Sequence, residues 1–451
     1  MSRRSSHAWL TFIQYHTAFV MYALLFLMLF SSVALESGYS YLGYLSLYFI
    51  ALVVSYFILI HFFQPLCLTG VLQLSFRSGF SKNVATTLLI CSVLFVLAHF
   101  MYLGHVPVIT ASLEDGYYDI MLIRQSIFFD APAVCRYIPN FLVKSIFPLL
   151  LLYFFLTSRP RFWTTMVVGS FYAVALMNKM FIVLIIMPLS VYFLLERKYF
   201  RVVCLSAVPI LGLMFIVFAQ NPMIRPAVWK DISSRLAGHV PSSSDIESIR
   251  NPKLQAEVSR LRAQIVQPHE SEALSGSDIA SYFQFVDTVY RRVFVIPGQV
   301  VSAWFHRIPA DVPFAEGCAS RPIASIKGCE FINMPRLIND LERPQLAKQG
   351  IQGTMTAASF MEDYANYGST GLILGGVLLG VVLAAIGSIF NASWRWSLVI
   401  NLIPISLLVE LSLTTVLLSG GWLISILLYW IFRGDFESAA GLRGRAGTIS
   451  S

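Results

Sequence analysis

The sequence carries little charge for its length. Only 12% of its 451 residues are Asp, Glu, Lys or Arg, whereas soluble domains carry about 25%. Hydrophobic residues make up 57% of the chain, and the mean hydropathy is +0.69. This composition excludes an ordinary soluble domain. The net charge is +8, but the cations are spread over many short loops, which argues against nucleic acid as a partner.

Several sequence signatures of enzymes are also missing. The chain has no P-loop, no H-E-x-x-H and no G-x-S-x-G, and no spacing of side chains typical of a metal site. The D-x-D pair that often holds a metal-bound nucleotide sugar is absent as well. The sequence therefore predicts no metal and no cofactor. If the protein is a glycosyltransferase, its donor is expected to be something other than a nucleotide sugar.

Cysteine is scarce, with six residues in the chain. Cys67, Cys91 and Cys204 lie in or beside apolar segments, where packing roles are favoured. Cys318 and Cys329 lie in a polar segment, 11 positions apart. They form either a disulfide, if that segment lies outside the cytoplasm, or two free thiols.

Long apolar runs are what the sequence has in abundance. Runs of about 20 apolar residues predict transmembrane helices, so the expected fold class is an all-α polytopic membrane protein. The first run is too long for a cleaved signal peptide and lacks a cleavage site. Residues 162–195 are short for two spans and are predicted to turn tightly at Asn178–Lys179. The ten predicted spans are 9–33, 42–62, 84–105, 141–157, 162–177, 180–195, 201–219, 368–390, 396–416 and 419–432.

Lys and Arg recur at alternate turns between these spans, beginning with Arg3 and Arg4. The positive-inside rule therefore predicts that both termini are cytoplasmic and that the two longer polar segments lie outside. Four regions follow from this order. They are 1–219, with seven helices and an outer segment at 106–140; 220–355, a large outer loop; 356–433, an interfacial segment and three helices; and 434–451, a cytoplasmic tail.

The large loop holds 15 Lys and Arg against 13 Asp and Glu, so it is not polybasic. Helical spacing at 254–266 and 278–307 predicts a mainly helical loop, with Pro297–Gly298 breaking the second helix. Arg291 lies one turn after Asp287 and either pairs with it or binds substrate. Arg292 lies at the edge of the apolar face and is a candidate for bidentate phosphate binding.

Further candidates lie near the predicted outer surface. Trp304 suits sugar stacking or interfacial anchoring, and His306 is either a general base or a structural residue. Arg124 and Arg136, in the first outer segment, are candidates for substrate binding. Lys179, at the hairpin turn, is expected near headgroup depth and is a functional candidate on that ground.

Two adjacent carboxylates, Glu362 and Asp363, stand at the outer end of the eighth span. Buried beside an apolar run they are costly unless used or paired, so one is expected to act as a base and the other to pair. Glu410, in the ninth span, is either a buried hydrogen-bonded acid, which is the favoured interpretation, or part of a cavity lining. His99 is expected to be packed.

Three segments resemble the Wzy-type polymerases of O-antigen and other surface oligosaccharide repeat units. RVFVIPG at 292–298 resembles the R-apolar-apolar-x-x-P-G segment of the family's large outer loop. EDYANYG at 362–368 is similar to its E-x-Y-x-N-F-G segment, although Asp363 stands where the family usually has Leu or Tyr. The turn at Asn178–Lys179 is similar to a Lys-bearing turn in mid-chain. A big outer loop late in a chain of many spans also fits.

The resemblance implies a GT-C-like fold and a metal-independent glycosyltransferase of the bacterial inner membrane, acting at the periplasmic face. The growing glycan would pass from undecaprenyl pyrophosphate to the next lipid-linked repeat unit, with a chain-length regulator as a possible partner. Departing pyrophosphate needs positive charge, for which Arg292, Lys179 and Arg124 are the candidates. Either Glu362 or His306 would accept the acceptor proton. The other candidate substrate-binding residues are Arg291, Arg136, Trp304, Tyr364 and Tyr367.

Three alternatives remain open. An O-antigen ligase shares the donor type, but the R-x-x-x-E-L pattern typical of ligases is absent. A flippase or transporter of lipid-linked oligosaccharides is expected to place charge at mid-span and to show repeat halves, whereas charge here is concentrated outside the spans. A membrane scaffold without catalytic activity is the third.

Overall fold

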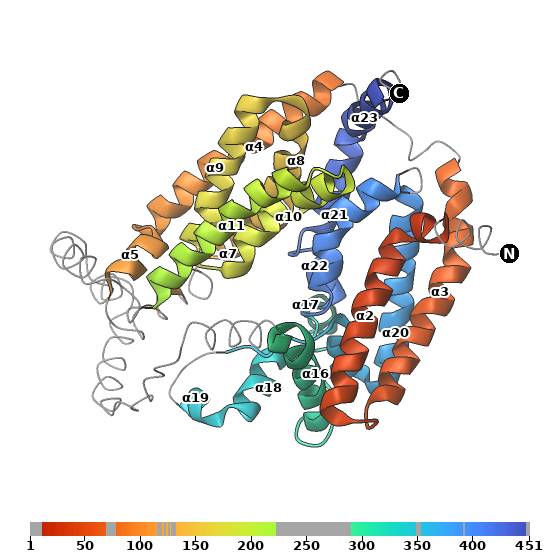
Figure 1. Cartoon of the computed structure of the whole chain (residues 1–451). Helices are drawn as coiled ribbons and strands as arrows, with labels where there is room; N and C mark the ends of the chain where they lie inside the picture. Colours follow the sequence, from red (N-terminus) through yellow and green to blue (C-terminus); the bar gives the residue numbers. More distant parts are fainter. Residues whose placement is uncertain are drawn as a thin grey trace, which may run out of the picture. The chain divides into compact units, whose positions relative to one another are not determined.

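The computed structural model describes residues 11–68, 78–114, 120, 123, 124, 127, 132–221, 290–348, 353–390 and 393–447. All regular secondary structure in these ranges is helical, which confirms the all-α part of the predicted fold class (Figure 1). The expected helix at 254–266 and the first part of that at 278–307 lie outside the described residues. Among the described residues, seven helices are long and apolar enough to cross a membrane: Thr17–Ser37, Leu42–Phe62, Gly79–Leu113, Val134–Thr157, Tyr199–Gln220, Ser359–Ile389 and Leu413–Ser438.

The other predicted spans are helical but shorter. The predicted hairpin is present: α9 (Arg159–Ala175) and α10 (Lys179–Leu195) flank a turn in which the Asn178 side chain accepts a hydrogen bond from the Met180 N–H, at 3.1 Å. The prediction of one span at 396–416 is wrong in one respect, because the helix there is not continuous. α21 (Trp394–Leu407) ends soon after Pro404, and α22 (Leu413–Leu417) begins at a new N-cap, Ser412.

The chain packs as two units that do not follow the sequence order of the predicted regions. Unit 1 comprises Met1–Leu74 and Pro268–Leu418, and unit 2 comprises Ser75–Gln267 and Ser419–Ser451. The first two spans therefore pack with the segment that follows the large loop. The last span packs with the middle of the chain. Each unit is described by itself below.

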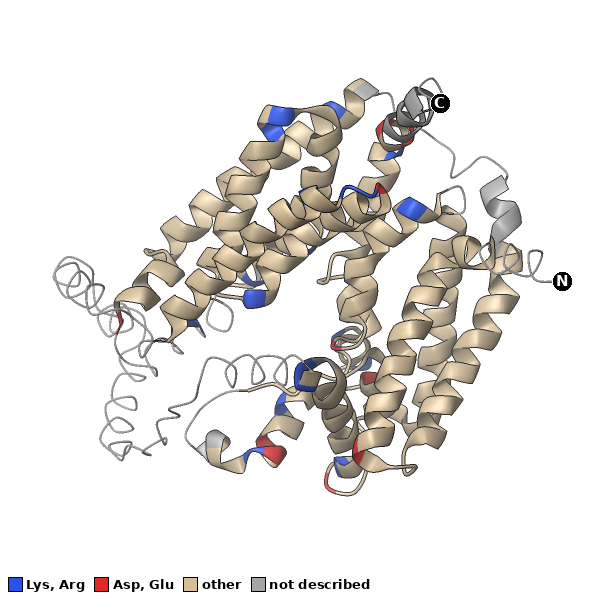
Figure 2. Cartoon of the chain, in the orientation of Figure 1, with Lys and Arg blue, Asp and Glu red and all other residues tan. Residues whose placement is uncertain are grey.

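Unit 1 is built on α2 (Thr17–Ser37), α3 (Leu42–Leu68) and α20 (Ser359–Ile389). Charged residues are nearly absent along these three helices (Figure 2). α20 lies against α3 through glycines: a Cβ at Gly376 would overlap the Tyr48 carbonyl oxygen, and one at Gly380 would overlap the Ser55 hydroxyl. Small residues at such positions let helix backbones approach closely in lipid, where dispersion contacts replace the hydrophobic effect.

Shorter helices cover one end of that bundle. The chain runs through a π-helical turn, η3 (Arg291–Val295), directly into α16 (Ile296–Arg307). Beyond it lie α17 (Arg321–Lys327), α18 (Met334–Glu342) and α19 (Pro344–Lys348). The break predicted at Pro297–Gly298 does not occur. Pro297 lies in the first turn of α16, where a missing backbone N–H costs least.

Gly298 fixes α16 against α2. Its backbone N–H donates to the Ser32 hydroxyl at 2.9 Å, and a Cβ there would overlap the Ser32 carbonyl oxygen. The glycine is therefore required for close packing rather than for a turn.

Gly298→Ala is expected to lower the free energy of unfolding by about 1–3 kcal/mol, because the added methyl group forces α16 away from α2. Gly43→Ala is the matched control, since a Cβ at this helical glycine of α3 has nothing within 4 Å. It is expected to be neutral or to stabilise by up to about 1 kcal/mol. Both values can be measured by denaturant unfolding of the purified protein in detergent. Equal stability of the two variants would contradict the packing role.

Unit 2 contains α4 (Ser78–Leu103), α5 (Pro107–Leu113), α7 (Ala133–Phe141), η1 (Leu142–Ile146), α8 (Phe147–Thr157), α9, α10, α11 (Tyr199–Gln220) and α23 (Trp422–Gly447). The C-terminal helix α23 is tied to the rest by polar contacts. The Tyr153 hydroxyl donates to Asp435 at 2.7 Å, and the Ser81 hydroxyl donates to the Ile431 carbonyl at 2.8 Å. His99 is buried and bonded to the Tyr172 hydroxyl at 2.7 Å, so the packed role predicted for it is confirmed.

Candidate functional site

A cavity of about 250 Å³ lies in unit 1, at the end of the bundle covered by the short helices. Its charged lining residues are Arg292, Arg343 and Glu410, two cations against one anion, so the cavity has a net positive lining. The remaining lining is Ile296, Pro297, Val300, Asn339, Thr354, Met355, Thr356, Ala357 and Val409. The cavity joins segments that are separated in the sequence by more than a hundred residues, and local patterns could not have predicted it.

Arg292 reaches this cavity from the π-helical turn that precedes α16. The side chain of Arg292 is exposed, as is that of its neighbour Arg291, but only Arg292 lines the cavity. Pro297 is itself part of the lining, and Gly298 holds the same stretch against α2. The RVFVIPG segment therefore positions a guanidinium at a fixed wall. Asp287, the expected partner of Arg291, lies outside the described residues.

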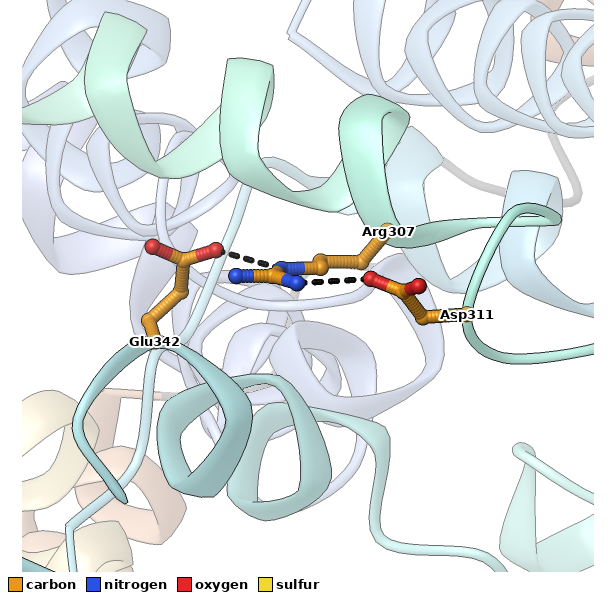
Figure 3. A network of polar contacts seen from close by, with 3 residues as sticks. All are labelled: Arg307, Asp311 and Glu342. Atoms are coloured by element: carbon orange, nitrogen blue, oxygen red, sulfur yellow. Dashed lines mark hydrogen bonds and ion pairs between the residues drawn. The ribbon is translucent and has the colours of Figure 1, made fainter.

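Arg343 is a site residue that sequence reasoning missed. It directly follows Glu342 at the end of α18. Figure 3 shows how that end is held: Arg307 Nε donates to Glu342 Oε1 at 2.7 Å, and Arg307 Nη1 donates to Asp311 Oδ2 at 2.6 Å. The two carboxylates, Asp311 first, raise the pKa of the Arg307 guanidinium. This ion-pair network links α18 to α16, and Arg343 lines the same cavity as Arg292.

Trp304 supports a third wall of the cavity. Its indole Nε1–H donates to the Met355 carbonyl at 3.0 Å, and the Met355 N–H donates to the Pro335 carbonyl at 2.8 Å. These two bonds fix residues 354–357, which line the cavity. The Trp304 side chain is only 2% exposed. The stacking surface predicted for it is thus covered by protein, because the ring packs between α16 and this segment.

Glu410 differs from its favoured interpretation as a buried, hydrogen-bonded acid. It lies in the break between α21 and α22, where its side chain is exposed, and it lines the cavity with the two arginines. The physical reason is the interruption of the predicted span. Because the helix stops at Leu407, Glu410 lies in a turn instead of inside a continuous helix, and its side chain is exposed.

The EDYANYG segment forms the first turns of α20 and a kink. Tyr367 and Gly368 have non-helical backbone angles, and Gly368 has φ of 60°, which favours glycine. The two carboxylates point in different directions. Glu362 lies beside the hydroxyls of Ser320 and Ser412, the latter two residues from Glu410. Asp363 packs against Gly375, on the continuing helix.

Asn366 ties this segment to the preceding loop. Its Oδ1 accepts hydrogen bonds from the backbone N–H groups of Gly317 and Ala319, each at 3.0 Å, and its Nδ2 donates to the Glu362 carbonyl at 2.9 Å. The asparagine of the motif is therefore a buried clamp. The sequence offered no signal for this role beyond the motif itself.

The loop that Asn366 holds also contains the cysteine pair. Cys318 and Cys329 form a disulfide. The Lys327 ammonium bonds to the Glu316 carbonyl and lies 5.6 Å from the centroid of the Tyr367 ring. Tyr367 is 38% exposed, so part of this side chain is accessible beside a cation.

Tyr364 and His306 have different environments. The Tyr364 hydroxyl donates to the Ile308 carbonyl at 3.1 Å, and its ring packs edge-on against Phe305 at 4.7 Å. At 4% exposure it is covered by protein, so the stacking role predicted for Tyr364 does not fit its position. His306 is exposed on α16 and is not part of the cavity lining.

The remaining predicted cations belong to unit 2. Lys179 is the first residue of α10 and is exposed, as is Arg124. Arg136 is half-buried in α7. Arg124 and Lys179 lie near the same buried apolar cluster, which contains Ile123, directly before Arg124, and Met177, two residues before Lys179. The candidate residues thus divide into two sets, one in each unit.

The geometry of the cavity suits an anionic group. Two guanidinium groups in one lining can donate several hydrogen bonds to phosphate oxygens, while the carboxylate of the same lining can accept a proton. The fold and the cavity define a polytopic α-helical membrane protein with a positively lined polar site. Comparison of the chain with models of protein families, with curated proteins and with solved structures finds no match.

Proposed function

We propose that the protein is an inner-membrane polysaccharide polymerase. It transfers a growing glycan from undecaprenyl pyrophosphate onto an incoming lipid-linked repeat unit at the periplasmic face. The observation that carries the proposal is the meeting of Arg292, Arg343 and Glu410 in one cavity of unit 1. The motif resemblance had pointed to the first of these residues independently.

The proposed reaction is a glycosyl transfer. A hydroxyl oxygen of the acceptor sugar attacks the anomeric carbon of the donor. The bond between that carbon and the pyrophosphate oxygen breaks, and the pyrophosphate leaves with the electron pair. Arg292 and Arg343 stabilise the negative charge that develops on it, which is where preorganised donors accelerate a reaction most. The acceptor proton passes to a carboxylate.

Glu410 is the proposed base, because it is the acid in the cavity lining. Glu362, predicted for this role, lies beside Ser412 and is the alternative. His306 is less suited, because it points to the surface outside the lining. Tyr367 and Lys327 are positioned at the surface near the same motif, where they suit contact with the sugar chain.

A polysaccharide ladder tests this function. Deleting the gene in its host is expected to leave lipid A-core carrying a single repeat unit, because flipping and ligation continue without polymerisation. The extracted lipopolysaccharide is separated on a gel. Loss of every core-attached repeat would indicate a ligase or a flippase, and an unchanged ladder of lipopolysaccharide and capsule would remove the proposal.

A further inference from the structure

An apolar groove with a cavity of about 370 Å³ runs between α5, α9, α10 and α11 in unit 2. Three of its residues are large and exposed: Ile109 at 48%, Phe171 at 47% and Phe215 at 39%. Its one hydroxyl, on Ser170, donates to the Met166 sulfur in its own helix at 3.8 Å. The groove therefore offers hydrocarbon contacts and leaves no polar group that a polar ligand would satisfy.

Two cations lie close to residues of this groove or of the apolar cluster beside it. Val108 and Val174 belong both to the groove and to the apolar cluster that contains Ile123 and Met177. Arg124 directly follows Ile123 and is exposed. Lys179 begins α10 one turn before Ile182, which lines the groove, a rise of about 4.5 Å along the helix.

An apolar groove with two cations close to its residues matches an amphiphile with an anionic head. The cavity has the size of a single acyl chain and could enclose only a fraction of a polyprenyl chain. We propose that unit 2 binds one anionic phospholipid of the bilayer, with an acyl chain in the groove and its phosphate at Lys179 and Arg124. This site is built from residues of unit 2 alone and does not depend on the proposed polymerase activity.

Native mass spectrometry of the full chain tests the site with two probes, dioleoyl phosphatidylglycerol and dioleoyl phosphatidylcholine, which share acyl chains and differ in head-group charge. The wild type is expected to prefer the anionic lipid. Lys179→Gln is expected to reduce that preference about fivefold, the effect of one cation near a headgroup. Its affinity for phosphatidylcholine is expected to stay unchanged.

Filling the groove with a larger side chain is expected to weaken the binding of the acyl chain instead. Val208→Trp, at a half-exposed lining position of α11, should weaken the binding of both lipids about tenfold, since the acyl chain in the groove loses its contacts. Leu211→Trp adds the same ring to the same helix, at a residue that is 66% exposed and outside the lining, and should change neither affinity. Ile109→Trp fills the groove from α5 if the Val208 variant does not fold.

Each contrary outcome overturns the proposal. If the Val208 and Leu211 variants weakened lipid binding equally, the groove would be excluded as the site of the acyl chain. Equal wild-type affinity for both phospholipids would exclude the head-group contact. Displacement of phosphatidylglycerol by an equimolar amount of undecaprenyl phosphate would assign the site to a carrier lipid.

Discussion

Long glycan chains are expected to disappear when Arg292 is replaced by alanine, while the protein remains in the membrane. The substitution removes one of the two guanidinium groups that line the cavity of unit 1. Loss of one preorganised donor at a developing anion typically lowers the rate by about 10²–10³-fold. Because the Arg292 side chain is exposed, folding should be little affected. The readout is the ladder of lipopolysaccharide from cells carrying the variant, with protein abundance measured in the same membranes.

Two comparisons sharpen this experiment. Arg343→Ala is expected to give the same loss, since the structure places Arg343 in the same lining. Arg336→Ala is the matched control: Arg336 lies on α18, pairs with Asp340 at 3.8 Å and is not part of the lining. A normal ladder from the Arg292 variant would remove that residue from the site. Shortened chains from the Arg336 variant would show that charge on α18, rather than the cavity, is responsible.

Asn366→Ala is expected to destabilise the protein by about 2–4 kcal/mol, because two backbone N–H groups in the loop lose their acceptor and buried unsatisfied donors cost about 1–3 kcal/mol each. Those groups belong to Gly317 and Ala319. The loop around Cys318 would also lose its anchor to α20. The free energy of unfolding in detergent measures the effect.

The matched control is Asn140→Ala, which removes a single side-chain bond within its own helix, from Nδ2 to the Arg136 carbonyl at 3.0 Å. A loss of about 1 kcal/mol or less is expected there. Asn366→Asp keeps the oxygen that accepts both N–H groups and should recover part of the stability. Comparable destabilisation by the alanine variants at 366 and 140 would show that Asn366 does not hold the loop.

The short motifs identified residues that matter in the structure, but they did not predict what those residues do there. RVFVIPG was expected to contain a helix break, yet Gly298 is a contact point between α16 and α2. Proline and glycine are read as breakers from local propensity, and only the partner helix shows that a close approach is what the glycine permits. The motif asparagine is similar. Asn366 bonds to residues nearly fifty positions earlier, which no local pattern encodes.

Glu362 and Asp363 could not be told apart in the sequence, because both are carboxylates beside an apolar run. Their separation follows from helix geometry: consecutive residues point about 100° apart, so one faces Ser412 and the other faces Gly375. Which face meets which neighbour depends on the docking of α20. Trp304 and Tyr364 illustrate the same limit, since an aromatic ring that suits sugar stacking suits core packing equally.

The sequence by itself determined the class of fold, the positions of most of the long apolar helices and the tight turn between α9 and α10. These features follow from hydrophobic run length and local turn chemistry, which act over a few residues. Only the tertiary structure decided that Arg292, Arg343 and Glu410 share a cavity. It also decided that the span around 396–416 is interrupted and that the first two helices pack with α20. These outcomes depend on contacts between residues far apart in the chain, and such contacts leave no periodic trace in the sequence.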